Sequence, residues 1–252
     1  MSDAITYHCD AARATLTLNR PETHNRLSVA DLALLESLLE HADAEPGVRT
    51  IVLTATPGPV FCAGFEIDAL LDTDWTDNQF TRTVERLEGM SRPTICSIGG
   101  AIYGGACELA MACDLRVGTP EIVLQIPPAR LGLAYFPSGL RRFVERLGPG
   151  PTKRLFLTAE KATGTDLVQM GFLDYLVSED DLMAKTDALA DRLAALAPNA
   201  VQEMKKSIDG IARGTLDEKQ ALAAAVRSFG SAESREGIAA FREKRVPRFD
   251  DN

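Results

Sequence analysis

Short apolar segments alternate with segments of helical periodicity through the first half of the chain, and this alternation constrains the fold most. The strand-like segment TIVLTA (50–55) is followed by turns and by a stretch near residues 77–90 that predicts a helix. The strand-like TICSI (94–98) precedes GGACELAMACD (104–114), which predicts another helix, and LRVG (115–118) predicts a further strand. Strands separated by helices usually pair in parallel. We therefore expect a mixed α/β fold.

The N-terminal region adds a pair of strands and one helix. AITYHCD (4–10) and RATLTLN (13–19) have the composition of paired strands. Ser28 begins a long apolar-periodic segment, Asp31 stands in its first turn, and Gly47 follows its end. These are the start and stop signals of a helix, because Ser caps free N–H groups and Gly adopts the conformation that ends a helix.

The C-terminal third is helical in pattern. Apolar residues recur at three- and four-residue spacing in the segments 181–196, 200–214 and 218–229. We expect an α/β core over residues 1–195 and a helical C-terminal region over residues 196–252, with a role in oligomerisation.

Composition excludes several classes of function. The net charge is -9, and the basic residues are scattered, so we expect no nucleic-acid partner and no anionic membrane surface. The three histidines all lie in the first 41 residues, and none is spaced with Cys, Asp or Glu as a metal-ligand set. No GxSxG motif is present either. We therefore expect neither a metal site nor a Ser-His-Asp triad.

The cysteines indicate the compartment. They are odd in number, follow no CxxC spacing and stand in apolar surroundings: Cys9, Cys62, Cys96, Cys107 and Cys113. This pattern is typical of a cytosolic protein whose cysteines are reduced and buried in the core. No leader-like N-terminus and no bilayer-length apolar run is present in the sequence. We expect a soluble, cytoplasmic protein.

A single acid, Glu108, interrupts the apolar run that follows the second glycine pair of SIGGAIYGGACELAMACDL (97–115). Gly104 and Gly105 precede a helix, whose free N–H groups and dipole favour an anion. Glu108 follows Gly105 by one helical turn, so an oxyanion donor and an acid/base group would lie side by side. The alternative is a tight strand-to-helix turn in which Glu108 is ion-paired or exposed to solvent.

A second glycine-containing turn stands in TPGPVFCAGFEIDAL (56–70). Its residues Ala63, Gly64 and Phe65 are able to present another backbone N–H group. An ordinary loop with buried Phe61 and Cys62 also fits this segment.

Together these segments resemble the crotonase, or enoyl-CoA hydratase/isomerase, superfamily. The matching features are LNRPETHNRLS, FCAGFEIDAL, GGAIYGGACELAMACDLRV, PARLGL and SREGIAAFREKRVPRF, in family order along nearly the whole chain. The resemblance implies a spiral of ββα units with a C-terminal helical region, assembled as a homotrimer or homohexamer. It implies that the amides of Phe65 and Gly105 form an oxyanion hole for an acyl-CoA thioester.

The resemblance also implies roles for further residues. Glu108 would be the acid/base, and Tyr135 would be a second active-site group, although a packed aromatic also fits Tyr135. The substrate would be bound by Arg26, Leu27, Ala63, Gly64, Glu66, Ile67, Tyr103, Gly104, Pro128 and Leu131. A solvated loop cation fits Arg26 equally well. CoA would enter as part of the substrate, with no separate cofactor.

The sequence does not decide which reaction of the family this protein catalyses. Hydratases of this family generally carry a second glutamate where this chain has Pro128. Hydration of a 2-enoyl-CoA is the first expectation. Double-bond isomerisation, decarboxylation of a malonyl-type acyl-CoA and a catalytically silent CoA-binding protein are the alternatives.

Overall fold

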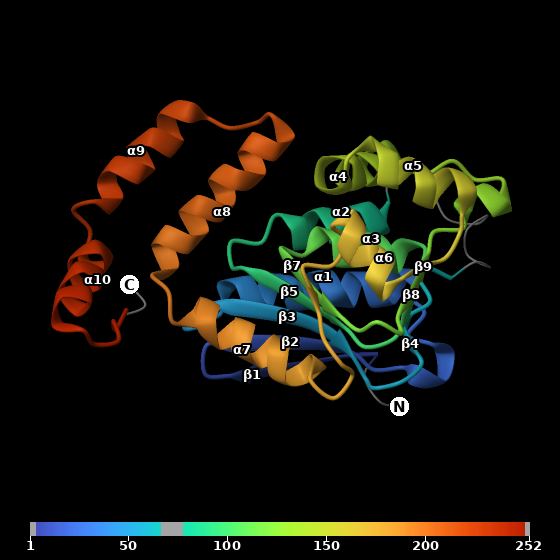
Figure 1. Cartoon of the computed structure of the whole chain (residues 1–252), viewed down its shortest axis with the longest axis horizontal. Coiled ribbons are helices and arrows are strands. Elements are labelled where there is room, and N and C mark those ends of the chain that lie inside the picture. Colours follow the sequence, from blue (N-terminus) through green and yellow to red (C-terminus); the bar gives the residue numbers. More distant parts are fainter. Residues whose placement is uncertain (1–3, 67–77, 250–252) are drawn as a thin grey trace.

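A computed structural model describes residues 4–66 and 78–249 of the chain. These residues form an α/β body, from which the last helices project as an arm (Figure 1). The mixed α/β fold expected from the sequence is confirmed. Ile67 lies outside the described residues.

The larger sheet carries the frame of the body. Among the described residues its order is β1 (Ile5–Asp10), β2 (Arg13–Leu18), β3 (Thr50–Ala55), β5 (Thr94–Ile98), β7 (Leu115–Gly118) and β10 (Tyr175–Leu176). The β1–β2 pair is antiparallel, and every other neighbouring pair of this sheet is parallel. The expected N-terminal strand pair and the expected parallel pairing are therefore both present.

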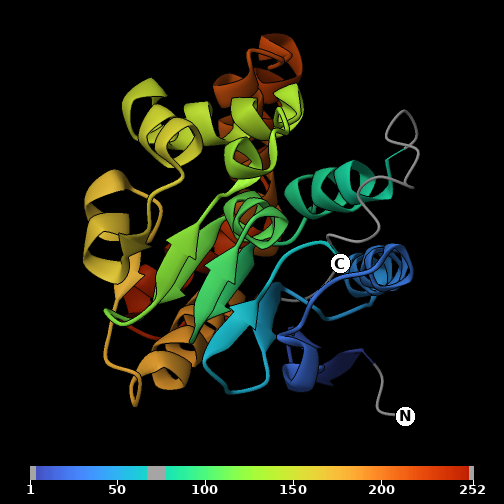
Figure 2. The same ribbon diagram turned by 90° about the vertical axis from the view of Figure 1, so that its right-hand side faces the viewer.

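The smaller sheet carries the loops that surround the site. Its order is β4 (Val60–Cys62), β6 (Ala101–Tyr103), β8 (Val123–Gln125) and β9 (Ala162–Thr163). Figure 2 shows β4, β6 and β8 side by side, and their pairing is parallel. Each of them directly follows one strand of the larger sheet, so the chain passes repeatedly from one sheet to the other. This is the ββα spiral that the resemblance implied.

The helices divide into those that pack around the sheets and those that form the projecting arm. Those of the body are α1 (Val29–Ala44), α2 (Gln79–Glu88), α3 (Gly105–Ala112), α4 (Pro137–Leu147), α5 (Pro149–Thr158), α6 (Gly164–Met170) and α7 (Leu182–Ala194), with the short 3-10 turns η1 (Pro21–Thr23) and η2 (Pro128–Leu131). Those of the arm are α8 (Pro198–Arg213), α9 (Glu218–Ser228) and α10 (Ala232–Glu243). The expected boundary at residue 195 falls between α7 and α8.

Local signals explain where α1 begins. The Ser28 side chain accepts a hydrogen bond from the Asp31 N–H, and the Asp31 carboxylate accepts one from the Ser28 N–H. This reciprocal arrangement satisfies two N–H groups that the first turn of a helix leaves unpaired. The expected helix start at Ser28 is confirmed.

The core places α3 at the centre of the molecule. Every residue of α3 from Ala106 to Ala112 is buried, with Glu108 among them. The opposite face of the larger sheet packs against α7, where Val52, Ile95 and Val117 contact Leu189 and Ala190. Burial of such side chains contributes about 1.5–3 kcal/mol each relative to exposure. Glu108 therefore lies among buried core residues of α3.

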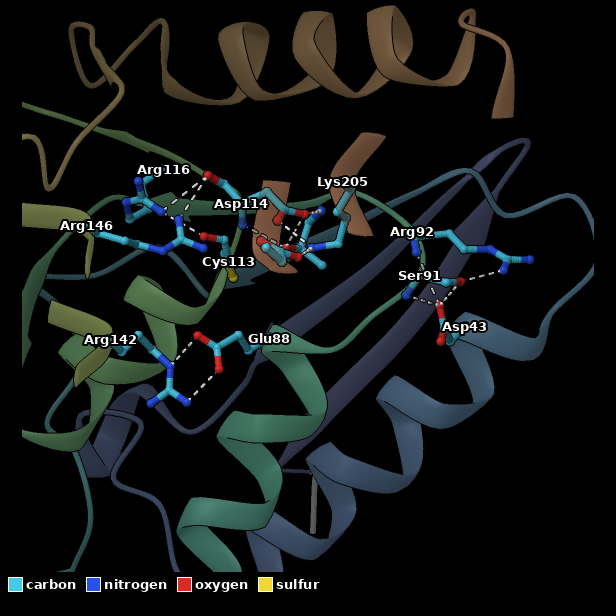
Figure 3. A network of polar contacts seen from close by, with 12 residues as sticks. Asp43, Glu88, Ser91, Arg92, Cys113, Asp114, Arg116, Arg142, Arg146 and Lys205 are labelled. Atoms are coloured by element: carbon cyan, nitrogen blue, oxygen red, sulfur yellow. Dashed lines mark hydrogen bonds and ion pairs between the residues drawn. The ribbon is translucent and has the colours of Figure 1, made fainter. Parts of the chain in front are cut away.

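The arm is attached to the body by ion pairs of α8. Lys205 Nζ lies 2.5 Å from Asp114 Oδ1, and Arg213 Nη2 lies 3.3 Å from Glu88 Oε2 (Figure 3 shows the Lys205–Asp114 pair). Large apolar side chains of the arm are exposed, with Phe229 at 83% and Phe241 at 85%. Among residues 4–66 and 78–249, none of the helices combines the length and the apolar character needed to cross a bilayer.

Candidate active site

The first loop of the site is held in extended form against residue 27. The Leu27 N–H donates to the Gly64 carbonyl at 2.8 Å, and the Glu66 N–H donates to the Leu27 carbonyl at 3.0 Å. Leu27 and Phe65 thereby form a parallel bridge. Because successive residues of an extended chain direct their N–H groups to opposite sides, the Phe65 N–H points away from Leu27.

The second loop turns from β6 into α3. Gly104 has φ +53° and its N–H donates to the Gln125 carbonyl at 2.9 Å. Gly105 is the first residue of α3, and within the described part of the chain its N–H makes no hydrogen bond. A first-turn N–H of a helix has no intrahelical acceptor and carries part of the positive end of the dipole. It is therefore available to an oxygen atom of a ligand.

The two loops approach each other through Gly64. This residue has φ +87°, and a Cβ atom placed on it would lie 3.3 Å from the Gly105 nitrogen and 2.7 Å from the Tyr103 carbonyl oxygen. Only a glycine allows backbone to approach so closely. The amide groups that follow Gly64 and Gly104 are thus brought together by the same contact.

An apolar cavity of about 320 Å³ opens beside these two loops. Predicted residues on its wall are Ala63, Phe65, Tyr103, Gly104, Gly105, Pro128, Leu131 and Tyr135. A larger cavity of about 810 Å³ lies between the arm and the body. It is lined mainly by charged and small side chains of α8 and α9, away from both glycine loops, so the smaller cavity is the candidate site.

Glu108 lies behind this wall, not on it. The side chain is buried, at 3% exposure, and Arg142 Nη1 lies 2.5 Å from its Oε1 atom. Burial raises the pKa of Glu108, while a hydrogen bond from the Tyr135 hydroxyl and the charge of Arg142 act in the opposite direction. On balance the pKa of Glu108 is raised above its usual value. The sequence left open whether Glu108 is ion-paired or exposed to solvent. In the structure it is buried and ion-paired.

Tyr135 connects Glu108 to the cavity. Its ring packs edge-on against Phe156 with the centroids 4.9 Å apart, and its hydroxyl is hydrogen-bonded to Glu108. Burial, and after it the negative charge of Glu108, raise the pKa of Tyr135 well above its usual value. The phenol therefore stays protonated and acts as a donor. Tyr135 therefore packs against a neighbouring aromatic ring and also lines the cavity.

Arg142 joins Glu108 to a second buried carboxylate. Its Nε and Nη2 atoms donate to the two oxygens of Glu88, each at 2.9 Å (Figure 3). Arg142 is 1% exposed, and Arg141 and Arg213 also approach Glu88, at 3.7 and 3.3 Å. Burial works against ionisation of Glu88, but these arginines outweigh it and hold the pKa of Glu88 below its usual value.

The residues expected on the CoA side lie apart from the cavity wall. Arg26 forms an ion pair with Glu66 at 3.4 Å, and both side chains are partly exposed. Leu27 is buried, and its backbone holds the Phe65 loop. Arg26 is therefore a surface residue with a carboxylate partner, and its contact to a substrate stays a prediction.

Several residues of the site were not anticipated from the sequence. Arg142, Glu88 and Gly139 surround Glu108, and the cavity wall also contains Phe80, Pro127, Leu133, Ala134 and Phe136. A Cβ atom on Gly139 would lie 2.7 Å from Glu108 Oε2 and 2.5 Å from Tyr135 Cε1. The glycine at the start of α4 was the one local signal of this close contact.

Comparisons with known proteins show which family the chain resembles. The family model described as enoyl-CoA hydratase/isomerase matches residues 9–252. YngF of Bacillus subtilis, whose name assigns it to the enoyl-CoA hydratases/isomerases, is 31% identical over 92% of each chain. A short-chain-enoyl-CoA hydratase of Clostridium acetobutylicum is 27% identical, again over 92% of each chain.

Solved structures show the same fold. An enoyl-CoA hydratase/isomerase family protein from Hyphomonas neptunium superposes with a TM-score of 0.93 at 30% identity, over 99% of this chain and 98% of that one. The match of the family model and of the fold extends over the two glycine loops, Glu108 and the arm. The chain therefore belongs to the enoyl-CoA hydratase/isomerase family.

Proposed function

We propose that this protein binds an acyl-CoA thioester in the apolar cavity and hydrates a 2-enoyl-CoA. The observation that carries the proposal is the contact of Gly64 with the Gly105 amide at the cavity wall, with Glu108 one helical turn beyond Gly105. In the proposed complex the thioester oxygen accepts hydrogen bonds from the N–H groups of Phe65 and Gly105. The acyl chain lies against the apolar wall.

The amides act on charge that develops during the reaction. When water adds to C3 of the enoyl group, negative charge moves to the thioester oxygen as an enolate forms. Fixed N–H donors stabilise this charge more than they stabilise the ground state, and one such donor contributes about 3 kcal/mol. Because these donors are backbone groups, truncation of a side chain does not remove them.

Glu108 supplies the proton transfers. As a carboxylate it takes a proton from water while the water oxygen bonds to C3. It then returns that proton to C2 as the enolate collapses, so protons and electrons balance over the cycle. Tyr135, hydrogen-bonded to Glu108 at the cavity wall, orients the carboxylate. A positioned acid/base group of this kind contributes about 10²- to 10⁴-fold in rate.

Double-bond isomerisation is the second candidate. Pro128 is on the cavity wall, and within the described part of the chain no acidic side chain on that wall adds a second acid to Glu108. One carboxylate is enough to remove a proton from C2 of a 3-enoyl-CoA and return it at C4. The same enolate and the same amides serve both reactions.

A spectrophotometric assay tests the proposal. Purified protein is mixed with 2-enoyl-CoAs of short and medium chain length, and loss of the conjugated thioester absorbance is followed for wild type and Glu108→Gln. Hydration by wild type and its loss in Glu108→Gln support the proposal. Gain of that absorbance from 3-enoyl-CoAs alone selects the isomerase, and CO₂ release from malonyl-type thioesters selects a decarboxylase. Binding of CoA thioesters without turnover of any of them indicates a silent family member.

A homotrimer or homohexamer is the assembly that we expect. The arm exposes large apolar side chains along all of its helices: Met204, Ile208, Ile211, Leu222, Val226, Phe229, Ile238 and Phe241. Exposed apolar surface of this extent is typical of an association surface. Assembly of identical chains through the arm would remove these side chains from water.

No cofactor other than the CoA of the substrate is required by this chemistry. Cytoplasmic localisation is supported by the cysteines, which are unpaired among the described residues, with Cys62, Cys96, Cys107 and Cys113 buried. Burial raises the pKa of the Cys62 thiol to about 12, so this group is inert at neutral pH.

A further inference from the structure

The carboxylate of Glu108 is held by two contacts of α4. Its Oε1 atom accepts from Arg142 Nη1 at 2.5 Å, and its Oε2 atom lies 2.7 Å from the point where a side chain on Gly139 would begin. Gly139 and Arg142 are three residues apart on one helix, so they share a face. One face of α4 therefore determines where both oxygens of Glu108 lie.

Arg142 is itself fixed. Two parallel hydrogen bonds of 2.9 Å join it to Glu88 at the end of α2, and its side chain is 1% exposed. A bidentate pair with a carboxylate restricts a guanidinium far more than a single contact does. The third nitrogen of the guanidinium group, Nη1, is thereby directed at Glu108.

The polar and charged groups that face Glu108 come from α2, α3, α4 and the segment before α4. Arg142 on α4 and Glu88 on α2 are the charged groups, Tyr135 in the segment before α4 is a hydrogen-bond donor, and Cys107 is the neighbour on α3. Arg142 favours the ionised form of Glu108, whereas the negative charge of Glu88 opposes it. The two buried neighbours thus act on the Glu108 carboxyl with opposite sign.

We propose that Arg142 is a positioning residue, which Glu88 fixes in place and which keeps Glu108 ionised with its second oxygen beside Tyr135 at the cavity wall. The catalytic consequence rests on the proposed function; the electrostatic consequence does not. Arg142 does not line the apolar cavity, so it acts on the site through Glu108.

Direct titration tests the electrostatic part. Protein labelled with ¹³C at the glutamate side-chain carboxyl is titrated by NMR, and Glu108→Gln identifies the signal of Glu108. Arg142→Gln is expected to move the Glu108 midpoint upward by about one pH unit or more, because it removes an adjacent opposite charge. Glu88→Gln is expected to move it downward. Loosened packing does not produce shifts of opposite sign, so shifts in one direction, or none, overturn the proposal.

One further variant and Glu88→Gln guard against loss of folding. Arg142→Lys keeps the positive charge but loses the bidentate geometry of the guanidinium group. It is expected to leave the titration midpoint of Glu108 closer to that of wild type than Arg142→Gln does. If Arg142→Gln does not fold, the sign of the shift in Glu88→Gln decides the proposal. A Glu88→Gln midpoint at or above that of wild type then overturns it.

A small substitution on α4 tests the positioning part. Gly139→Ala removes no charge and adds a methyl group that displaces the Glu108 carboxylate and the Tyr135 ring. Gly150→Ala on α5 is the matched control, because a Cβ atom there meets nothing within 4 Å. We expect kcat of Gly139→Ala to fall about 10- to 100-fold, with KM within about 3-fold of wild type. An unchanged kcat overturns the positioning part of the proposal, because the rate then does not depend on where α4 holds the carboxylate.

The outcomes separate the two claims. Absence of turnover by wild type on every enoyl-CoA refutes the proposed function, while the titration still decides how Glu108 is held. Turnover that Glu108→Gln abolishes but Gly139→Ala leaves intact supports the function and refutes the positioning role.

Discussion

A side chain on Gly64 would begin 3.3 Å from the amide nitrogen of Gly105, although the two residues belong to different ββα units. The contact exists because β4 and β6 are neighbours in the smaller sheet and each leads into one of the loops. Two backbone segments that are far apart in sequence are thus held side by side by parallel pairing. The oxyanion hole of the proposed function depends on this contact.

Substitution of Gly64 should damage both stability and activity. In Gly64→Ala the new Cβ would lie 2.7 Å from the Tyr103 carbonyl, at φ +87°, a conformation that alanine rarely adopts. Backbone strain of this kind costs about 1–3 kcal/mol, and the displaced loop would misplace the Phe65 amide. Thermal unfolding and turnover of 2-enoyl-CoA measure the two effects. Gly58→Ala is the control, since its nearest neighbour would lie 3.9 Å away; equal behaviour of the two variants contradicts the prediction.

The pH dependence of the rate should report the environment of Glu108. The reaction needs the carboxylate, and burial raises the pKa of Glu108 above its usual 4.5. The rate is therefore expected to be high above this raised pKa and to fall as the pH decreases through it. A profile of kcat against pH measures the acid limb, which in Glu88→Gln should move to lower pH. An acid limb at or below pH 4.5 in wild type contradicts the prediction.

Parts of this arrangement could be predicted from the sequence because their signals are local. Ser28 and Asp31 mark the start of α1 within four residues, and the glycine pair before Glu108 marks the turn into α3. The apolar neighbours of Glu108 on α3 indicated its burial. In contrast, β9 and β10 have two residues each and carry no periodicity of their own.

The partners of Glu108 could not be predicted in the same way. Arg142 lies 34 residues from Glu108 and 54 residues from Glu88 in the sequence, and the packing of α4 on α3 and α2 brings them together. Nothing in the local pattern of α4 distinguishes Arg142 from the exposed Arg141 beside it. A buried ion pair of this kind appears only when the helices have been placed.

A glutamate in place of Pro128 should increase hydration. Pro128 is on the cavity wall at the start of η2, where a residue without an N–H is tolerated but not required. In Pro128→Glu a second acid can donate a proton to C2, and hydration of 2-enoyl-CoA is expected to rise at least about tenfold, a part of what a positioned acid supplies. Pro128→Gln keeps the size of that side chain without the acid and should not show the gain. Equal rates of hydration for the two variants would refute this assignment of position 128.

Charges on the arm should disrupt assembly. Phe229 and Phe241 are the most exposed large apolar side chains of the described residues, and a charge at either position opposes burial between chains. Wild type is expected to have the mass of three or six chains by size-exclusion chromatography with light scattering. The double variant Phe229→Glu, Phe241→Glu should elute as smaller species, whereas Gln220→Glu, on the same arm, should not. A double variant that assembles like wild type contradicts this use of the arm.

A crystal structure with a non-reactive acyl-CoA analogue tests the central claim most directly. We expect the thioester oxygen at about 2.7–3.1 Å from the backbone nitrogens of both Phe65 and Gly105, with C2 and C3 on the side of Tyr135 and Glu108. A carbonyl oxygen bound elsewhere, or an acyl chain outside the apolar cavity, would contradict it.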